Sequence, residues 1–157
     1  MTRRLIFLSA LFFAAAAGAA DDSLDDAFSK DVLIIEASAH ACHRFDVYLA
    51  VNNAQRARGL MQVRHLPPNT GMLFIYERSG YISMYMKNTY IPLDMVFVRA
   101  DGSISSVARN TEPMSLRSIV ATEPVSFVLE LNAGTTEKLF IDENSRLVLE
   151  TVDNYDE

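Results

Sequence analysis

The chain has 157 residues, one cysteine and a formal net charge of −6, with 20 acidic and 14 basic side chains. A single cysteine excludes an intramolecular disulfide. An acidic chain without a basic cluster is not expected to bind nucleic acid, because phosphate contacts need clustered Lys and Arg.

The first residues have the order of a secretory signal peptide, with two arginines, an apolar run and a small-residue run. The candidate cleavage sites follow Ala19 and Ala20. The apolar run Leu5–Phe13 is shorter than the roughly 20 apolar residues of a membrane span, and no cysteine directly follows the small-residue run to carry a lipid. We therefore expect no stable membrane anchor after cleavage. The mature protein is therefore predicted to be periplasmic or secreted.

The remaining chain is predicted to form one domain, since its length suits a single core of ordinary size. Five aspartates and little apolar content favour a solvated segment before that domain. The expected division is a signal peptide at 1–20, an acidic linker at 21–31, a β-rich domain at 32–152 and an acidic tail at 153–157.

Alternating and fully apolar runs predict a series of short strands. The expected strands span residues 32–36, 44–51, 72–76, 83–87, 93–98, 103–107, 125–131 and 146–150. The first two should pair as a hairpin, Asp101-Gly102 should turn a second hairpin, and residues 78–80 should form a turn.

Two short helices are expected between these strands. Asn52 or Asn53 could cap one over residues 54–58, and Thr135 or Thr136 could cap another that runs to Phe140. The sequence shows no strand–helix alternation. We therefore predict a mostly β (α+β) fold, a compact antiparallel barrel or sandwich of about seven or eight strands.

The stretch Met84–Asp94 sets polar groups into apolar sequence. Pro92 fixes φ and bends the chain, so Lys87 and Asp94 are expected to form a partly buried ion pair, because an unpaired buried charge costs several kcal/mol. The same groups could instead line a recess for a small polar ligand, such as a sugar or an envelope fragment. The candidate ligand-binding residues are Tyr85, Lys87, Asn88, Thr89 and Asp94, with Arg58 and Glu130 as neighbours.

Six motifs follow one another in a specific order. They are Arg58-Gly59-Leu60-Met61, Leu66-Pro67, Gly71-Met72-Leu73-Phe74, Met86-Lys87-Asn88-Thr89, Ile91-Pro92-Leu93-Asp94 and Val128-Leu129-Glu130-Leu131-Asn132-Ala133-Gly134. Together they resemble the family called domain of unknown function 192, over about His43 to Ile141. The resemblance implies a small, often exported, β-rich domain with no established activity. Tyr85 stands where the family commonly has tryptophan, and Asp142-Glu143-Asn144 replaces the usual Gly-Asp turn.

Metal binding has little support in the sequence. His40, Cys42 and His43 are zinc-ligand types, but no second close-set group exists, so a solvated turn is favoured. Methionines could indicate copper(I), yet their places in apolar strands fit core packing better. These methionines are Met61, Met72, Met84, Met86, Met95 and Met114. No metal or other cofactor is predicted.

A ligand- or partner-binding module is favoured over an enzyme, and no catalytic residue is assigned. No serine lies in a Gly-x-Ser-x-Gly elbow. The alternative is hydrolysis of an envelope polymer by Asp94 and Glu130, which would need their carboxyl groups about 5–9 Å apart in one open cleft. A binding module predicts a lined pocket without that pair, and a purely structural domain would bury the whole polar set.

Overall fold

The structure is a computed structural model, and it describes residues 24–148. The predicted signal peptide, its cleavage sites and the acidic tail lie outside the described residues. The helices are α1 (Leu24–Ala27), α2 (Asn53–Arg58) and α3 (Thr135–Lys138). The strands are β1 (Ser29–Glu36), β2 (Cys42–Ala50), β3 (Thr70–Gly80), β4 (Ser83–Met84), β5 (Leu93–Val98), β6 (Ile104–Ala108), β7 (Ile119–Val120), β8 (Val125–Asn132) and β9 (Arg146–Val148). Within 24–148, no helix is long and apolar enough to cross a bilayer.

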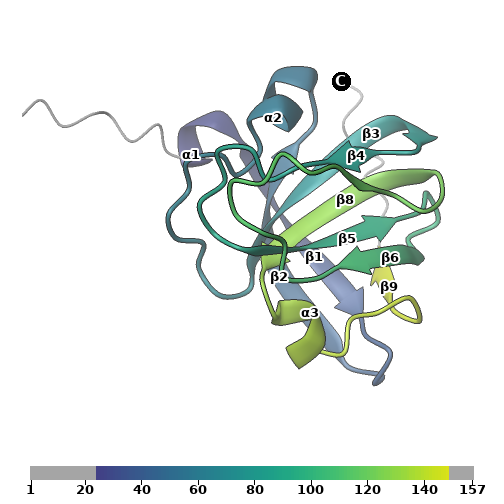
Figure 1. Cartoon of the computed structure of the whole chain (residues 1–157). Helices are drawn as coiled ribbons and strands as arrows, with labels where there is room; N and C mark the ends of the chain where they lie inside the picture. Colours follow the sequence, from purple (N-terminus) through teal and green to yellow (C-terminus); the bar gives the residue numbers. More distant parts are fainter. Residues whose placement is uncertain (1–23, 149–157) are drawn as a thin grey trace, which may run out of the picture.

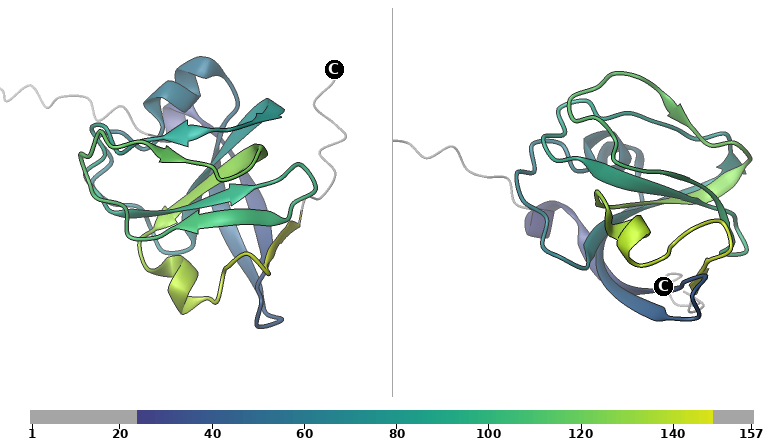
Figure 2. Two further views of the ribbon diagram at one scale, coloured as in Figure 1. Left: turned by 45° about the vertical axis from the view of Figure 1, so that its right-hand side comes forward. Right: turned by 60° about the horizontal axis from the view of Figure 1, so that its bottom comes forward.

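Seven strands form one curved sheet in the order β6-β5-β8-β3-β2-β1-β9. Neighbouring strands are antiparallel except for β2 and β3, which run parallel. An isolated bridge between Ser103 and Arg146 joins the two ends of this order, so the sheet curls into a nearly closed barrel (Figures 1 and 2). The predicted β-rich barrel with short helices is confirmed.

Successive side chains of a strand point to opposite faces of the sheet, and each face carries its own cluster of buried residues. The inner face fills the barrel with residues such as Phe45, Val96 and Leu129. The outer face carries Met72 and Met95, and it is covered by α1, α2, the chain after α2 and the two-stranded ribbon β4–β7. Because this layer covers the outer face, a pocket can form between the layer and the sheet.

The covering helix α2 comes from the connection between the parallel strands β2 and β3. Such a pair needs a crossover connection, here residues 51–69. Asn52 Oδ1 accepts a hydrogen bond from Gln55 N at 2.9 Å, and Gln55 Oε1 accepts one from Asn52 N at 3.3 Å. This reciprocal cap starts the helix, and Gly59, with φ of 49°, ends it. The predicted cap and end of this helix are confirmed.

Part of the acidic stretch folds onto the sheet. Residues 24–31, expected within the linker, instead form α1 and the start of β1. Phe28 is buried and packs edge-on against Tyr48, and Asp25 accepts a 2.7 Å hydrogen bond from the Tyr48 hydroxyl. Asp25 also pairs with Lys30 at 2.6 Å. The linker prediction is wrong for residues 24–31, because burial of Phe28 and the contacts of Asp25 hold this acidic segment against the sheet.

Three further elements differ from their predicted bounds. β3 continues to Gly80 through a register shift after Ile75, where a turn was expected. β4 ends at Met84 rather than Lys87, because Met86 N donates to the carbonyl of Ser115 outside the strand pairing. β9 is described only to Val148.

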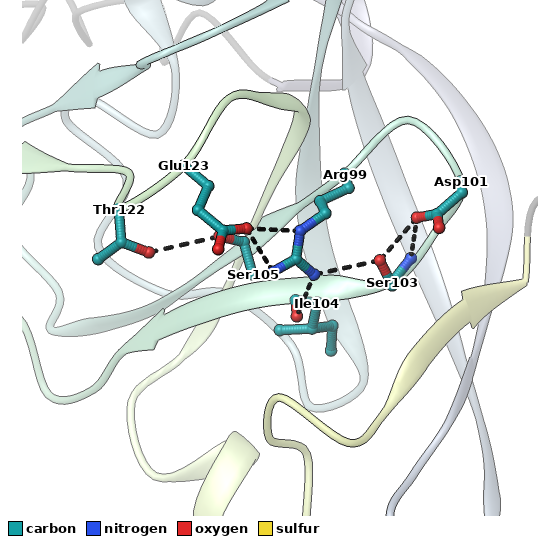
Figure 3. A network of polar contacts seen from close by, with 7 residues as sticks. All are labelled: Arg99, Asp101, Ser103, Ile104, Ser105, Thr122 and Glu123. Atoms are coloured by element: carbon teal, nitrogen blue, oxygen red, sulfur yellow. Dashed lines mark hydrogen bonds and ion pairs between the residues drawn. The ribbon is translucent and has the colours of Figure 1, made fainter.

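The predicted hairpin at Asp101-Gly102 joins β5 to β6. Arg99 ties it to the segment before β8, because its Nε donates to Glu123 Oε2 at 2.7 Å (Figure 3). Arg99 Nη1 also donates to Ser103 Oγ and to the Ile104 carbonyl. One guanidinium therefore fixes the hairpin against its neighbour.

Candidate functional site

Asp94 and Lys87 do not form the predicted ion pair. Asp94 is 0% exposed, whereas Lys87 is exposed. Asp94 Oδ1 accepts from Asn110 N at 2.9 Å, and Oδ2 accepts from Thr136 N at 2.9 Å and Thr136 Oγ1 at 2.8 Å. The prediction was wrong because neutral donors, rather than an ammonium group, satisfy the buried carboxylate.

Asp94 therefore has a structural position at one end of the barrel. It joins β5 to α3 and to the chain after β6, and Thr136 is fully buried beneath it. The expected cap of α3 by Thr135 or Thr136 is also wrong: Gly134, with φ of 80°, occupies the cap position. Thr136 instead directs its hydroxyl to Asp94.

Glu130 lies on the other face of the sheet. In β8 it stands opposite Met72 of β3 and Met95 of β5, and both methionines are 0% exposed. Within the described part of the chain, Glu130 Oε2 is buried and has no hydrogen-bond partner. Burial raises the pKa of Glu130 from 4.5 to about 8, so the carboxyl group is mostly protonated at neutral pH.

A pocket of about 200 Å³ lies beside Glu130, between α2, β3 and β4. We call it the Glu130 pocket. Its lining residues are Arg56, Ala57, Arg58, Gly59, Leu60, Met61, Phe74, Tyr76, Ser83, Met84, Tyr85, Thr89 and Glu130. A buried acid, three aromatic residues and two arginines thus line one small space.

Tyr76 and Arg56 form a fixed wall of the Glu130 pocket. The Arg56 guanidinium carbon lies 5.2 Å from the Tyr76 ring centroid. Arg56 Nη1 donates to the carbonyls of Val51 and Ile75 at 2.6 and 2.7 Å. Burial raises the pKa of Tyr76, whose hydroxyl lies 3.7 Å from Met84 Sδ. These contacts hold the wall in place without a ligand.

The structure brings four of the seven candidate residues together, since Arg58, Tyr85, Thr89 and Glu130 all line the Glu130 pocket. Lys87, Asn88 and Asp94 do not line it. Asn88 contacts a lining residue, because its Nδ2 is 3.9 Å from Met61 Sδ.

Sequence reasoning missed nine of the thirteen lining residues, among them Arg56, Phe74 and Tyr76. Alternation along β3 is the signal that could have found the two aromatic residues, because it places Phe74 and Tyr76 on the same face as Met72. The position of Arg56 over Tyr76 depends on how α2 packs.

The register of β5 and β8 separates Asp94 from Glu130. Asp94 stands opposite Leu131, on the inner face, whereas Glu130 stands opposite Met95, on the outer face. Two carboxylates that act on one bond must reach the same cleft. The structure therefore contradicts the predicted two-carboxylate arrangement for hydrolysis.

A larger hollow of about 490 Å³ lies over β1 and β2. Two of its lining residues, Lys30 and Asp46, are exposed and already paired, Lys30 with Asp25 at 2.6 Å and Asp46 with Arg44 at 2.9 Å. These charges have partners, unlike the buried oxygen of Glu130. The smaller pocket is therefore the better candidate site.

The described residues contain no group of three or more His, Cys, Asp or Glu side chains that could hold a metal ion. Cys42 is exposed at the start of β2. Met72, Met84, Met86 and Met95 are buried in the outer core, as core packing predicts, but Met114 is 51% exposed.

Comparison with known proteins gives a family and a fold. A profile of the DUF192 family, described as Uncharacterized ACR, matches residues 34–149. A solved Sinorhizobium meliloti 1021 protein, described as a candidate transcription regulator, is 40% identical, with a TM-score of 0.75 over 77% of this chain and 94% of its own. A protein of unknown function from Novosphingobium aromaticivorans DSM 12444 is 30% identical, with a TM-score of 0.71 over 77% of this chain and 84% of its own. No curated protein sequence matches the chain.

Proposed function

The chain belongs to the DUF192 family, and because this membership supplies a fold without an activity, we propose from the site that the protein binds a small, neutral, polar ligand in the Glu130 pocket. A sugar or another hydroxyl-bearing fragment of the cell envelope has the required chemistry. The order of residues 1–20 supports a periplasmic or secreted location for this binding.

The buried oxygen of Glu130 is the observation that carries the proposal. A buried polar group without a hydrogen bond costs about 1–3 kcal/mol, so such groups are rare in folded proteins. Here the same residue lines a pocket that a ligand could enter. A protonated carboxyl group donates its O–H, so the complementary ligand atom is a hydroxyl or carbonyl oxygen.

The charges around the pocket favour a neutral ligand over a cationic one. Arg56 and Arg58 both line it, and they would repel a cation. The volume of about 200 Å³ is below the roughly 300–1,000 Å³ of most ligand sites. The bound group should therefore be small, and the half-exposed ring of Tyr85 can stack on it at the opening.

The polar candidate residues thus have separate roles in this proposal. Asp94 stabilises the end of the barrel through three hydrogen bonds. Glu130, Tyr85 and Thr89 contact the ligand. Hydrolysis by Asp94 and Glu130 does not form part of the proposal, because the register places them on opposite faces.

Nuclear magnetic resonance titration with neutral monosaccharides tests the proposal. Glucose and N-acetylglucosamine are the probes, with glucosamine as the cationic and gluconate as the anionic comparison. We expect saturable shifts at the amides of Gly59 and Tyr85 with a neutral probe. Glu130→Leu should abolish them, because the donor is lost, whereas Glu130→Gln keeps a donor and should retain binding.

Tyr85→Ala should weaken binding, and Tyr81→Ala is its matched control. Tyr81 is 68% exposed and does not line the Glu130 pocket. The proposal fails if only glucosamine or gluconate binds. It also fails if Glu130→Leu and Tyr85→Ala leave the affinity for the neutral probe unchanged.

A further inference from the structure

Exposed apolar side chains gather on the ribbon β4–β7 and on the loops that continue it. These side chains are Tyr81 (68% exposed), Tyr85 (47%), Tyr90 (40%), Met114 (51%), Leu116 (74%) and Val120 (52%). We call them the ribbon face. Four other exposed large hydrophobic residues of the described chain lie outside these segments. Contiguous exposed apolar side chains of this kind mark interaction surfaces.

Hydrogen bonds place the two segments of the ribbon face side by side. Ser83 pairs with Val120 and Met84 with Ile119. Beyond the ribbon, Met86 N donates to the Ser115 carbonyl at 3.0 Å, and Met114 N donates to the Thr89 carbonyl at 3.0 Å. The segments run together along one side of the molecule (Figure 2).

The ribbon has one buried side and one exposed side. Met84 packs into the outer core and Ile119 packs against it, whereas their neighbours Ser83 and Val120 are exposed. This alternation is normal for strands that cover a core. It leaves Ser83 and Val120 on the side of the ribbon that faces away from the core.

Basic side chains predominate in the sequence segments that carry and adjoin the ribbon face. Residues 47–76, 78–93 and 113–122 contain no Asp or Glu, although the chain has 20 acidic side chains. The basic residues of these segments are Arg56, Arg58, Arg64, Arg78, Lys87 and Arg117. The Arg64 guanidinium carbon lies 4.8 Å from the Tyr90 ring centroid. Glu77 lies between the first two segments, and Glu112 and Glu123 flank the third.

We propose that the ribbon face docks on the surface of an anionic lipid bilayer. Tyrosine rings suit the boundary between headgroups and acyl chains, and aliphatic side chains such as Leu116 and Val120 can enter it. Lys87 and Arg117 then meet anionic headgroups. A nucleic acid would attract the same cations, but it would leave Leu116 and Val120 against a charged phosphate backbone.

Co-sedimentation of the full chain with lipid vesicles tests the proposal. The probes are vesicles of phosphatidylcholine alone and vesicles of phosphatidylcholine and phosphatidylglycerol in equal parts. Single-residue variants are compared with the wild type, so that any difference in vesicle binding comes from the substituted side chain. Lys87→Ala and Arg117→Ala should each weaken binding to the anionic vesicles about five-fold, and Leu116→Ser should also weaken it.

Two control variants lie elsewhere on the surface. Phe140→Ser removes a side chain that is 65% exposed after α3, and Arg44→Ala removes an exposed cation of β2. Both should bind like the wild type. The proposal would be overturned if the wild type bound both vesicle types equally. It would also be overturned if the Lys87→Ala and Leu116→Ser variants bound anionic vesicles as well as the wild type does. Binding to a DNA duplex but not to anionic vesicles would also overturn it.

These results are independent of ligand binding at Glu130. Lys87, Leu116 and Arg117 do not line the Glu130 pocket, so their substitution leaves its walls intact. A protein that binds sugars but not vesicles would contradict only the bilayer proposal. A protein that binds vesicles but not sugars would contradict only the ligand proposal.

Discussion

Replacing Glu130 by Gln should stabilise the protein at neutral pH. The carboxyl group titrates near 4.5 when solvated and at about 8 in the folded chain. Between these values the unfolded chain releases the proton while the folded chain keeps it, so the free energy of unfolding falls as pH rises and levels off above about 8. One pH unit in this window costs about 1.4 kcal/mol. At pH 7 the destabilisation by Glu130 therefore amounts to about 3 kcal/mol.

Urea unfolding of the wild type and Glu130→Gln at about pH 5 and about pH 8 measures this effect. The free energy of unfolding of Glu130→Gln should exceed that of the wild type by less than about 1 kcal/mol at the lower pH and by about 4 kcal/mol at the higher pH. Glu143→Gln, at an exposed position in the turn before β9, is the control and should show no such trend. An advantage that does not grow with pH would refute the reasoning, because it would mean that Glu130 is solvated or paired in the folded protein.

Three further predictions concern the rest of the chain. Asp94→Ala should lower the free energy of unfolding in urea by about 3–5 kcal/mol, because three donors lose their acceptor. Lys87→Ala should change it by no more than about 0.5 kcal/mol, and the two effects should add in the double variant. Strong coupling between the two substitutions would instead indicate a Lys87–Asp94 ion pair. Gly102→Ala should lower stability by about 2 kcal/mol or more in thermal unfolding, since φ is 86° and the new Cβ would lie 2.3 Å from the Leu147 carbonyl oxygen; an unchanged melting temperature would contradict this. Intact-mass measurement of periplasmic protein should show cleavage after Ala19 or Ala20, and a mass that still includes Met1 would exclude export with cleavage.

The fold could largely be predicted because its strands carry local signals. Leu93–Val98 is predicted to the residue, since Pro92 precedes it and Asp101-Gly102 turns the chain after it. β3 was underestimated because its last residues are polar and their pairing depends on distant β8. α1 was missed because Phe28 gains its burial from Tyr48, which local composition does not reveal.

The site could be predicted only in part, for a related reason. Alternation along β8 puts Glu130 on the same face as Val128, but it does not show that α2 and β4 cover that face. Lys87 and Asp94 lie close in sequence, so a pair was expected. The partners of Asp94 are instead Asn110 and Thr136, which lie 16 and 42 residues away. Pairing of β5 with β8 brings α3, and with it Thr136, to the end of the barrel.

The bridge between Ser103 and Arg146 also bears on aggregation. Open sheet edges offer unpaired N–H and C=O groups to other chains, which is a common route to fibrils. Here the two outer strands of the large sheet approach each other, and the Arg146 side chain donates to the Asp101 carbonyl across the junction. Opening this junction, rather than unfolding the whole barrel, would be the first step that makes the chain prone to self-association.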